Sequence, residues 1–72
     1  MDPPIAVVDT PLCLLVRLPA TPAVRADWQR WMGAGGYHSG SDTYTVSRRR
    51  RYALRAWLVR WEGRVRVEET TR

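Results

Sequence analysis

The chain has 72 residues, with twelve arginines, no lysine, seven acidic residues and a formal net charge of +5 at pH 7. A chain this short holds one domain and buries only about 60% of the surface that its unfolded form exposes. It has no apolar run near the roughly 20 residues that span a bilayer, and its start is not basic and apolar like a secretory signal. We therefore expect one soluble domain over residues 1–72, with a flexible leader at 1–4 and a flexible tail at 69–72.

Two strands are predicted before the first helix. Residues 5–8 form a short apolar run, which we place at a sheet edge because Pro11 prevents it from continuing. Residues 12–18 are predicted to be a central strand, since they are almost continuously apolar. Cys13 lies in this run and is the only cysteine, so we expect a buried free thiol rather than a metal ligand. A lone free thiol favours a reducing, cytoplasmic location.

The first predicted helix begins after Thr21, which is placed to cap it, with Pro22 at the first helical position. Gly33 is placed to end it. The apolar residues of this helix recur at helical spacing and share one face, which we expect to pack on the sheet. They are Val24, Trp28, Trp31 and Met32.

Residues 37–42 are predicted to form a polar loop, and residues 43–46 a short strand with Tyr44 and Val46 on the same side. The loop contains His38, Ser41 and Asp42, which are residue types found in hydrolytic sites. Catalytic groups converge from separate rigid elements, however, so their proximity along one loop does not indicate an active site.

A second helix is predicted from residue 48 to residue 61, with Ser47 as its cap. Its apolar arc consists of Leu54, Trp57, Leu58 and Trp61. Residues 64–68 then alternate between charged and apolar side chains, which is typical of a half-buried strand with Val65 and Val67 inward.

The predicted order is therefore β-α-β-α-β, with residues 5–8 as an additional strand. It indicates a small two-layer α+β domain in which two amphipathic helices pack on one face of a three- or four-stranded sheet. The opposite face of the sheet would remain open to water or to a partner.

Four consecutive arginines, residues 48–51, are the strongest local signal. The positive end of a helix dipole disfavours cations in the first turn, so this placement is expected to cost stability. Cations kept there suggest contact with an anion, which the backbone N–H groups of the helix start can also bind. A GC-rich genome explains the choice of arginine over lysine, but it does not explain the net excess of positive charge.

We interpret the chain as a small non-enzymatic binding module that contacts the phosphate backbone of nucleic acid. Aromatic residues beside the basic turn can stack on bases, and the candidates are Tyr37, Tyr44 and Tyr52. The residues predicted to contact phosphates or an acidic partner are Arg48, Arg49, Arg51, Arg55, Arg60, Arg64, Arg66 and Tyr52.

The alternative is a protein-binding accessory or inhibitor, such as a regulatory subunit or a phage-type protein, that docks the same arginines and an exposed tryptophan on an acidic protein. Homodimerisation fits either hypothesis, because the core is small and the chain has four tryptophans. No catalytic residues, metal ligands or cofactor motif are identified, so we expect no enzymatic activity, no metal and no cofactor.

Overall fold

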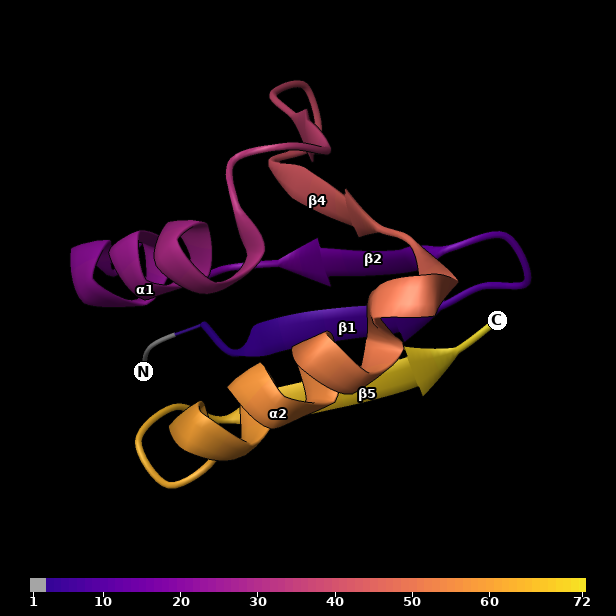
Figure 1. The fold of residues 1–72 in the computed structure, drawn as a ribbon. Helices are drawn as coiled ribbons and strands as arrows, with labels where there is room; N and C mark the ends of the chain where they lie inside the picture. The colour runs from indigo at the N-terminus through magenta and orange to yellow at the C-terminus, as the bar shows by residue number, and fades with distance from the viewer. Residues whose placement is uncertain (1–2) are drawn as a thin grey trace.

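Five strands form one mixed sheet in the computed structural model, which describes residues 3–72 (Figure 1). The order across the sheet is β3-β4-β2-β1-β5, and β1 and β5 are parallel whereas the other neighbours are antiparallel. Helices α1 and α2 both lie on one face of this sheet (Figure 1). The two-layer α+β class is therefore confirmed, with one strand more than predicted. The elements are β1 Ile5–Asp9, β2 Leu14–Arg17, α1 Pro22–Met32, β3 Tyr37–His38, β4 Thr43–Val46, α2 Arg51–Trp61 and β5 Val67–Thr71.

Strand β1 is central rather than at an edge, which corrects the prediction for residues 5–8. Pro11 does end the strand early, but β1 pairs with β2 on one side and with β5 on the other. Residues 10–13 form a turn instead of extending β2, because the Thr10 hydroxyl bonds both the carbonyl and the N–H of Cys13, at 2.8 and 3.1 Å. As a result Leu12 is 89% exposed and Cys13 is half-buried.

Helix α1 begins at Pro22 and ends before Gly33, as predicted. Thr21 stands at the cap position, but its side chain accepts no capping bond, and its carbonyl accepts the Arg25 N–H at 3.2 Å. The buried residues of α1 are Val24, Trp28 and Met32. Trp31 was predicted to face the core and is instead 42% exposed, because it lies at the border of the apolar arc that faces α2.

The segment predicted as a polar loop contributes the additional strand. Tyr37 and His38 pair with Tyr44 and Thr43 of β4 and form a short hairpin. Gly36 precedes the hairpin at φ +79°, and a Cβ there would lie 2.4 Å from the Thr45 carbonyl oxygen, so only glycine fits. Strand β4 has the predicted bounds and alternation, with Tyr44 buried in the core and therefore unable to stack on a base.

The predicted second helix divides into two parts. Arg48–Arg50 forms a single 3-10 turn, and α2 continues from Arg51 to Trp61. The Ser47 side chain accepts the Arg49 N–H at 3.3 Å, so the predicted cap is confirmed. The predicted apolar arc of α2 is buried as expected: Leu54, Trp57, Leu58 and Trp61.

Strand β5 begins later and ends later than predicted. Residues 64–66 lead into it, and residues 69–71, which were expected to fray, pair with Val7, Val8 and Asp9 of β1. The Arg72 N–H also donates to the Asp9 carbonyl at 2.8 Å. Long-range pairing with β1 thus orders a segment that is too polar to be recognised as a strand from its own sequence. Part of the predicted leader, residues 1–2, lies outside the described residues.

The core lies between the sheet and the two helices. Trp28 and Trp57 pack edge to face there, with ring centroids 5.0 Å apart, and Trp28 also contacts Tyr44 at 5.2 Å. The strands contribute the alternate positions that face the helices, which are Ile5, Val7, Leu14, Val16, Tyr44 and Val46. Within residues 3–72, none of the helices is both long enough and apolar enough to cross a membrane.

Candidate functional site

The arginines predicted to form one basic face belong to four separate places in the fold. Two of the four consecutive arginines bind backbone carbonyls of other elements. Arg48 forms an ion pair with Asp9 and donates to the Thr10 carbonyl, so it joins the helix start to the end of β1. Arg50 donates to the Met32 carbonyl at 3.1 Å and closes the end of α1. These two guanidinium groups reach away from the start of α2, which explains why the turn tolerates them.

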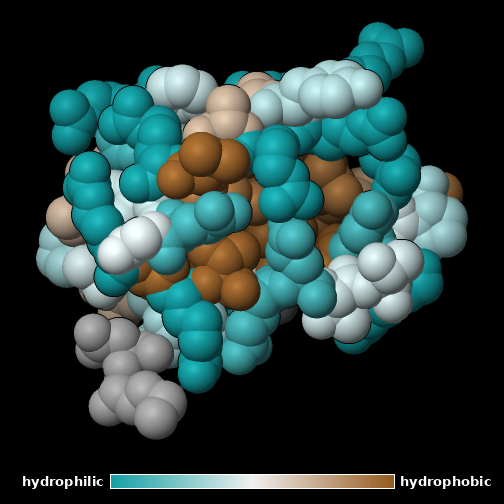
Figure 2. Space-filling model, turned by 90° about the horizontal axis from the view of Figure 1, so that it is seen from below, coloured by the Kyte–Doolittle hydropathy of each residue, from teal (hydrophilic) through white to brown (hydrophobic). Residues whose placement is uncertain are grey.

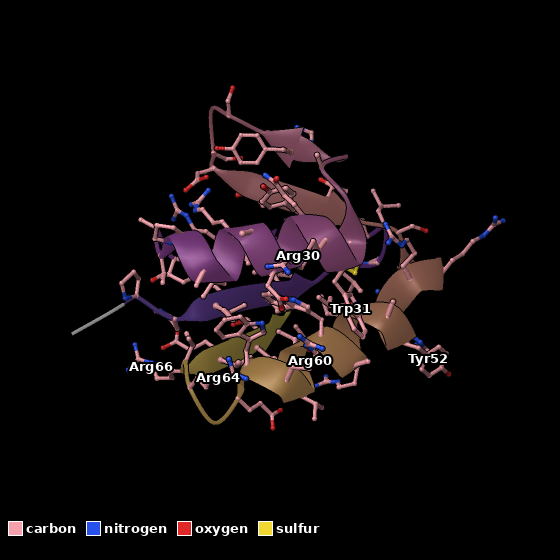
Figure 3. All side chains as sticks on the ribbon, turned by 60° about the vertical axis from the view of Figure 1, so that its left-hand side comes forward. Arg30, Trp31, Tyr52, Arg60, Arg64 and Arg66 are labelled. Carbon is pink, nitrogen blue, oxygen red and sulfur yellow. The ribbon has the colours of Figure 1, made fainter. Side chains whose placement is uncertain are left out.

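The other two arginines of the run lie with Tyr52 at the exposed start of α2. Arg49 is exposed, and Tyr52 has 75% of its surface accessible. The Arg51 guanidinium carbon lies 5.2 Å from the Tyr52 ring centroid, and its Nη2 lies 3.4 Å from the Tyr52 hydroxyl. Figure 3 shows Tyr52 pointing outward at this end of the helix, away from the other labelled residues.

Two predicted arginines are neutralised by glutamates of β5. Arg55 forms an ion pair of 2.7 Å with Glu69, and Arg66 forms one of 3.3 Å with Glu68. Glu69 shares the helix face of β5 with Val67, so the Arg55–Glu69 pair lowers the net charge between α2 and β5, whereas Glu68 and its pair with Arg66 lie on the opposite face of the sheet.

On this side, α2 and β5 enclose an open groove of about 340 Å³. Figure 2 shows hydrophobic residues gathered in this side of the molecule, with hydrophilic side chains around and across them. Val7, Leu14, Leu54 and Leu58 contribute its apolar lining, and Arg51, Arg55, Asp9 and Glu69 are among its polar residues. Because these polar residues include two cations and two anions, the groove has no marked preference for ligands of either charge.

The remaining two predicted arginines and two unpredicted residues lie on the surface of the two helices, with Arg30, Trp31 and Arg60 near one another and Arg64 farther along, at the end of α2 beside Arg66 (Figure 3). We name this group, Arg30, Trp31, Arg60 and Arg64, the Arg–Trp seam. The Arg60 guanidinium carbon lies 5.1 Å from the Trp31 ring centroid, and that of Arg64 lies 5.0 Å from the Trp61 ring centroid. Arg30 and Arg60 are in the last turns of their helices, where the helix dipole favours cations.

Beneath the seam, Asp27 of α1 contacts side chains of α2. Its Oδ2 accepts the indole N–H groups of Trp61 and Trp57, at 2.8 and 3.0 Å, and its Oδ1 lies 3.5 Å from Arg60. The bond from Trp61, followed by the bond from Trp57 and the nearby arginines, holds the pKa of Asp27 below its usual value. The side chain is only 16% exposed, so this carboxylate mainly fixes the two helices together and offers little surface to a ligand.

Trp31 is held rigidly although it is exposed. Its Nε1 donates to the Ala53 carbonyl of α2 at 3.0 Å, so the ring spans the two helices. The ring therefore presents an aromatic surface that is tied to α2 and lies beside the Arg60 cation. Within residues 3–72, neither Arg30 nor Arg64 has an acidic group within ion-pair distance.

Internal ion pairs decide where the net charge lies. In the described part of the chain, five arginines pair with five of its six acidic residues. The net charge of +5 therefore rests on the seven other arginines, which include Arg30 and Arg64 of the seam. Arg49 and Arg51 at the start of α2 belong to the same set.

Sequence reasoning identified Arg60 and Arg64 but missed Arg30, Trp31 and Asp27. Arg30 and Asp27 lie on the polar side of α1 and carry no distinctive pattern. Only the position of α2 beside α1 turns them into parts of one site. For Trp31 a signal was available, because four indoles exceed what so small a core can enclose.

No protein-family model matches this chain, and no curated protein or solved structure matches it either. The candidate site therefore stands on its own geometry and charge.

Proposed function

We propose that this protein is a non-enzymatic binding module that binds nucleic acid by contacting backbone phosphates at the Arg–Trp seam. The observation that supports this most directly is that Arg30, Arg60 and Arg64 lie on one side of the molecule, where Arg60 covers the exposed Trp31 ring and Arg64 covers the Trp61 ring. Guanidinium groups match the geometry of phosphate oxygens and donate paired hydrogen bonds to them. The free, half-buried thiol of Cys13 supports a cytoplasmic location for this activity.

The seam supports phosphate binding better than the consecutive arginines do. Arg48 already binds the Asp9 carboxylate of β1 and the Thr10 carbonyl of the following turn, and Arg50 binds the Met32 carbonyl of α1, so using them would require breaking tertiary contacts. Arg30 and Arg64 require no such exchange. Arg60 has an acidic partner, but the 3.5 Å separation and the 51% exposure of its side chain make that pair weak. All three guanidinium groups are therefore available to a ligand at small cost.

The test compares two double variants that lose the same charge. Arg30→Gln with Arg64→Gln removes two seam cations, whereas Arg55→Gln with Arg66→Gln removes two cations that form ion pairs with glutamates of β5. We expect the seam variant to bind labelled oligonucleotides about tenfold or more weakly by fluorescence anisotropy, and the control to bind nearly as well as the wild type. Equal losses would mean that binding follows net charge, and an unchanged seam variant would exclude the seam as the site.

The second candidate function is docking on an acidic protein, and the exposed Trp31 favours it. Tryptophan and arginine are the residues most enriched in the energetically dominant positions of protein interfaces. A shape-specific interface of that kind would survive an excess of generic DNA. Absence of oligonucleotide binding in near-physiological salt, together with capture of an acidic protein that DNA does not displace, would support this second function over the first.

A further inference from the structure

We infer that the nucleic acid bound is single-stranded and that one of its bases stacks on Trp31; this inference rests on the proposed function. The exposed ring is the reason. A duplex offers phosphates and base edges, and its base faces are already stacked on one another. An exposed indole beside a phosphate-binding cation, as Trp31 is beside Arg60, finds a stacking partner only where a base is unpaired.

The Trp31 ring is already ordered and accessible in the free protein. Its Nε1 is fixed on the Ala53 carbonyl at 3.0 Å, and 42% of the residue remains accessible. A side chain that is already immobilised loses little conformational entropy when a ligand packs on it. Because the indole is hydrogen-bonded to α2, the exposed position of Trp31 is fixed by the way the two helices pack.

Arg60 can take part in both steps, because it covers the Trp31 ring in the free protein and can bind a phosphate when a base replaces it. Its guanidinium lies over the Trp31 ring at 5.1 Å, in the place that a base would take, and its only acidic partner is the 3.5 Å contact with Asp27 within the described residues. When a base stacks on the ring, this guanidinium can turn to the adjacent phosphate. Asp27 remains satisfied, because the indole N–H groups of Trp57 and Trp61 still donate to it.

A comparable aromatic group at the other end of α2 provides the internal control. Tyr52 is 75% exposed and also lies beside an arginine, Arg51. Its ring is not bonded to another element, as its hydroxyl contacts only the neighbouring Arg51 among residues 3–72. We therefore expect Tyr52 to contribute less to binding than Trp31 does.

The experiment uses a labelled oligothymidylate, a duplex of the same length and polyphosphate as a competitor without bases. We expect the oligothymidylate to bind more tightly than the duplex and to quench the tryptophan fluorescence, since Trp31 is the most exposed of the four tryptophans. Trp31→Leu should weaken oligothymidylate binding about tenfold, leave polyphosphate binding unchanged, and exceed the effect of Tyr52→Leu. Trp31→Phe keeps an aromatic face and should retain part of the affinity, with folding checked by circular dichroism.

The two proposals fail in different ways. If Trp31→Leu and Trp31→Phe bind oligothymidylate as the wild type does, or if the duplex binds equally well without quenching, the stacking inference is wrong while phosphate binding stands. If neither oligothymidylate nor polyphosphate binds the wild-type protein, the proposed function itself is wrong. Should Trp31→Leu fail to fold, the wild-type quenching and the Trp31→Phe variant decide the question.

Discussion

The two flanks of helix α2 carry similar side chains and offer different surfaces. Toward β5, Arg55 is paired with Glu69 at 2.7 Å, above a groove whose cations and anions balance. Toward α1, Arg60 lies over an indole, and within residues 3–72 neither Arg30 nor Arg64 has an acidic group within ion-pair distance. The same helix thus has one neutralised flank and one cationic flank. The number of arginines along a helix therefore says less about binding than the position of the acids that face them.

The neutral flank also protects the sheet edge. Strand β5 has an unpaired outer edge, and exposed edges can pair with other chains. Glu68 and Glu69 place charged side chains along it, and both are held by arginines. On this flank the arginines pair with the glutamates of the edge strand, while those of the seam are proposed to remain available to a ligand.

The largest expected effect comes from Trp57→Ala, which removes the support of both flanks. Trp57 is fully buried, packs on Trp28 and Trp61, and donates to Asp27. We expect a loss of about 3–5 kcal/mol in the free energy of unfolding. A domain of this size is stabilised by only about 4–11 kcal/mol, so much of its stability would disappear. Urea denaturation followed by circular dichroism measures the loss, and a variant as stable as the wild type would contradict this packing.

The next effect comes from Asp27, which joins α1 to Trp57 and Trp61 of α2 beneath the seam. Asp27→Ala leaves the indole N–H groups of Trp57 and Trp61 without their acceptor, at a cost of about 2–4 kcal/mol. Asp27→Asn is the matched control, since its amide oxygen can still accept and only the charge is lost. Denaturation of both variants beside the wild type measures the difference. Equal stability of Asp27→Ala and the wild type would show that these bonds do not hold the helices together.

Asp27 also gives the seam a dependence on pH. The pKa of Asp27 is lowered in the folded state from the usual value of 3.8, because the indole N–H groups bond to the carboxylate. The stabilisation is therefore present above about pH 4 and is lost as the pH falls through the folded-state pKa. We expect the wild type to lose stability in acid more steeply than Asp27→Asn. Carboxyl groups titrate between about pH 2 and 5. If the free energy of unfolding falls equally in both proteins over this range, the assignment is contradicted.

A smaller effect is the dependence of oligonucleotide affinity on salt, which tests the cationic flank. If Arg30, Arg60 and Arg64 each engage one phosphate of a single strand, affinity should fall about 20-fold between about 50 and 200 mM salt. Anisotropy titrations at several salt concentrations give the slope. The variant Arg30→Gln with Arg64→Gln should reduce the slope by about two thirds. A slope that does not change in this variant would place the phosphates elsewhere.

The smallest effect is expected from a substitution that makes the β5 flank of α2 more cationic. Glu69→Gln releases Arg55 from its ion pair, which is partly exposed and contributes about 1 kcal/mol or less to stability. We expect unfolding to change little and oligonucleotide binding to tighten a few-fold, because one more cation is available. Unchanged or weaker binding would indicate that the β5 flank lies too far from the ligand to contribute.

Periodicity predicted the elements whose own residues determine them. The buried arc of α2, the alternation in β4 and the limits of α1 follow from local spacing, and all three are confirmed. Two assignments failed because they depend on distant partners. Residues 69–71 carry no strand signal and become ordered by pairing with β1, and this pairing also makes β1 central.

The candidate site was only half predictable for a related reason. Arg60 and Arg64 were expected to be exposed from their places in the sequence, whereas Trp31 fell within the apolar arc of α1. Its exposure depends on how α1 lies beside α2, and sequence spacing contains no information about that. The partners of Arg48 and Arg55, namely Asp9 and Glu69, are likewise set by the tertiary fold.

The parallel pairing of β1 with β5 has a consequence for biosynthesis. Residues 5–9 leave the ribosome long before residues 67–71, so one side of β1 remains without its native neighbour until nearly all of the fold has been made. During this interval the nascent chain exposes an apolar strand edge that other chains can join. Distant pairing also slows the search for the native sheet, since a long loop must close before the contact forms. Until residues 67–71 pair with it, this edge of β1 is therefore open to pairing with other chains.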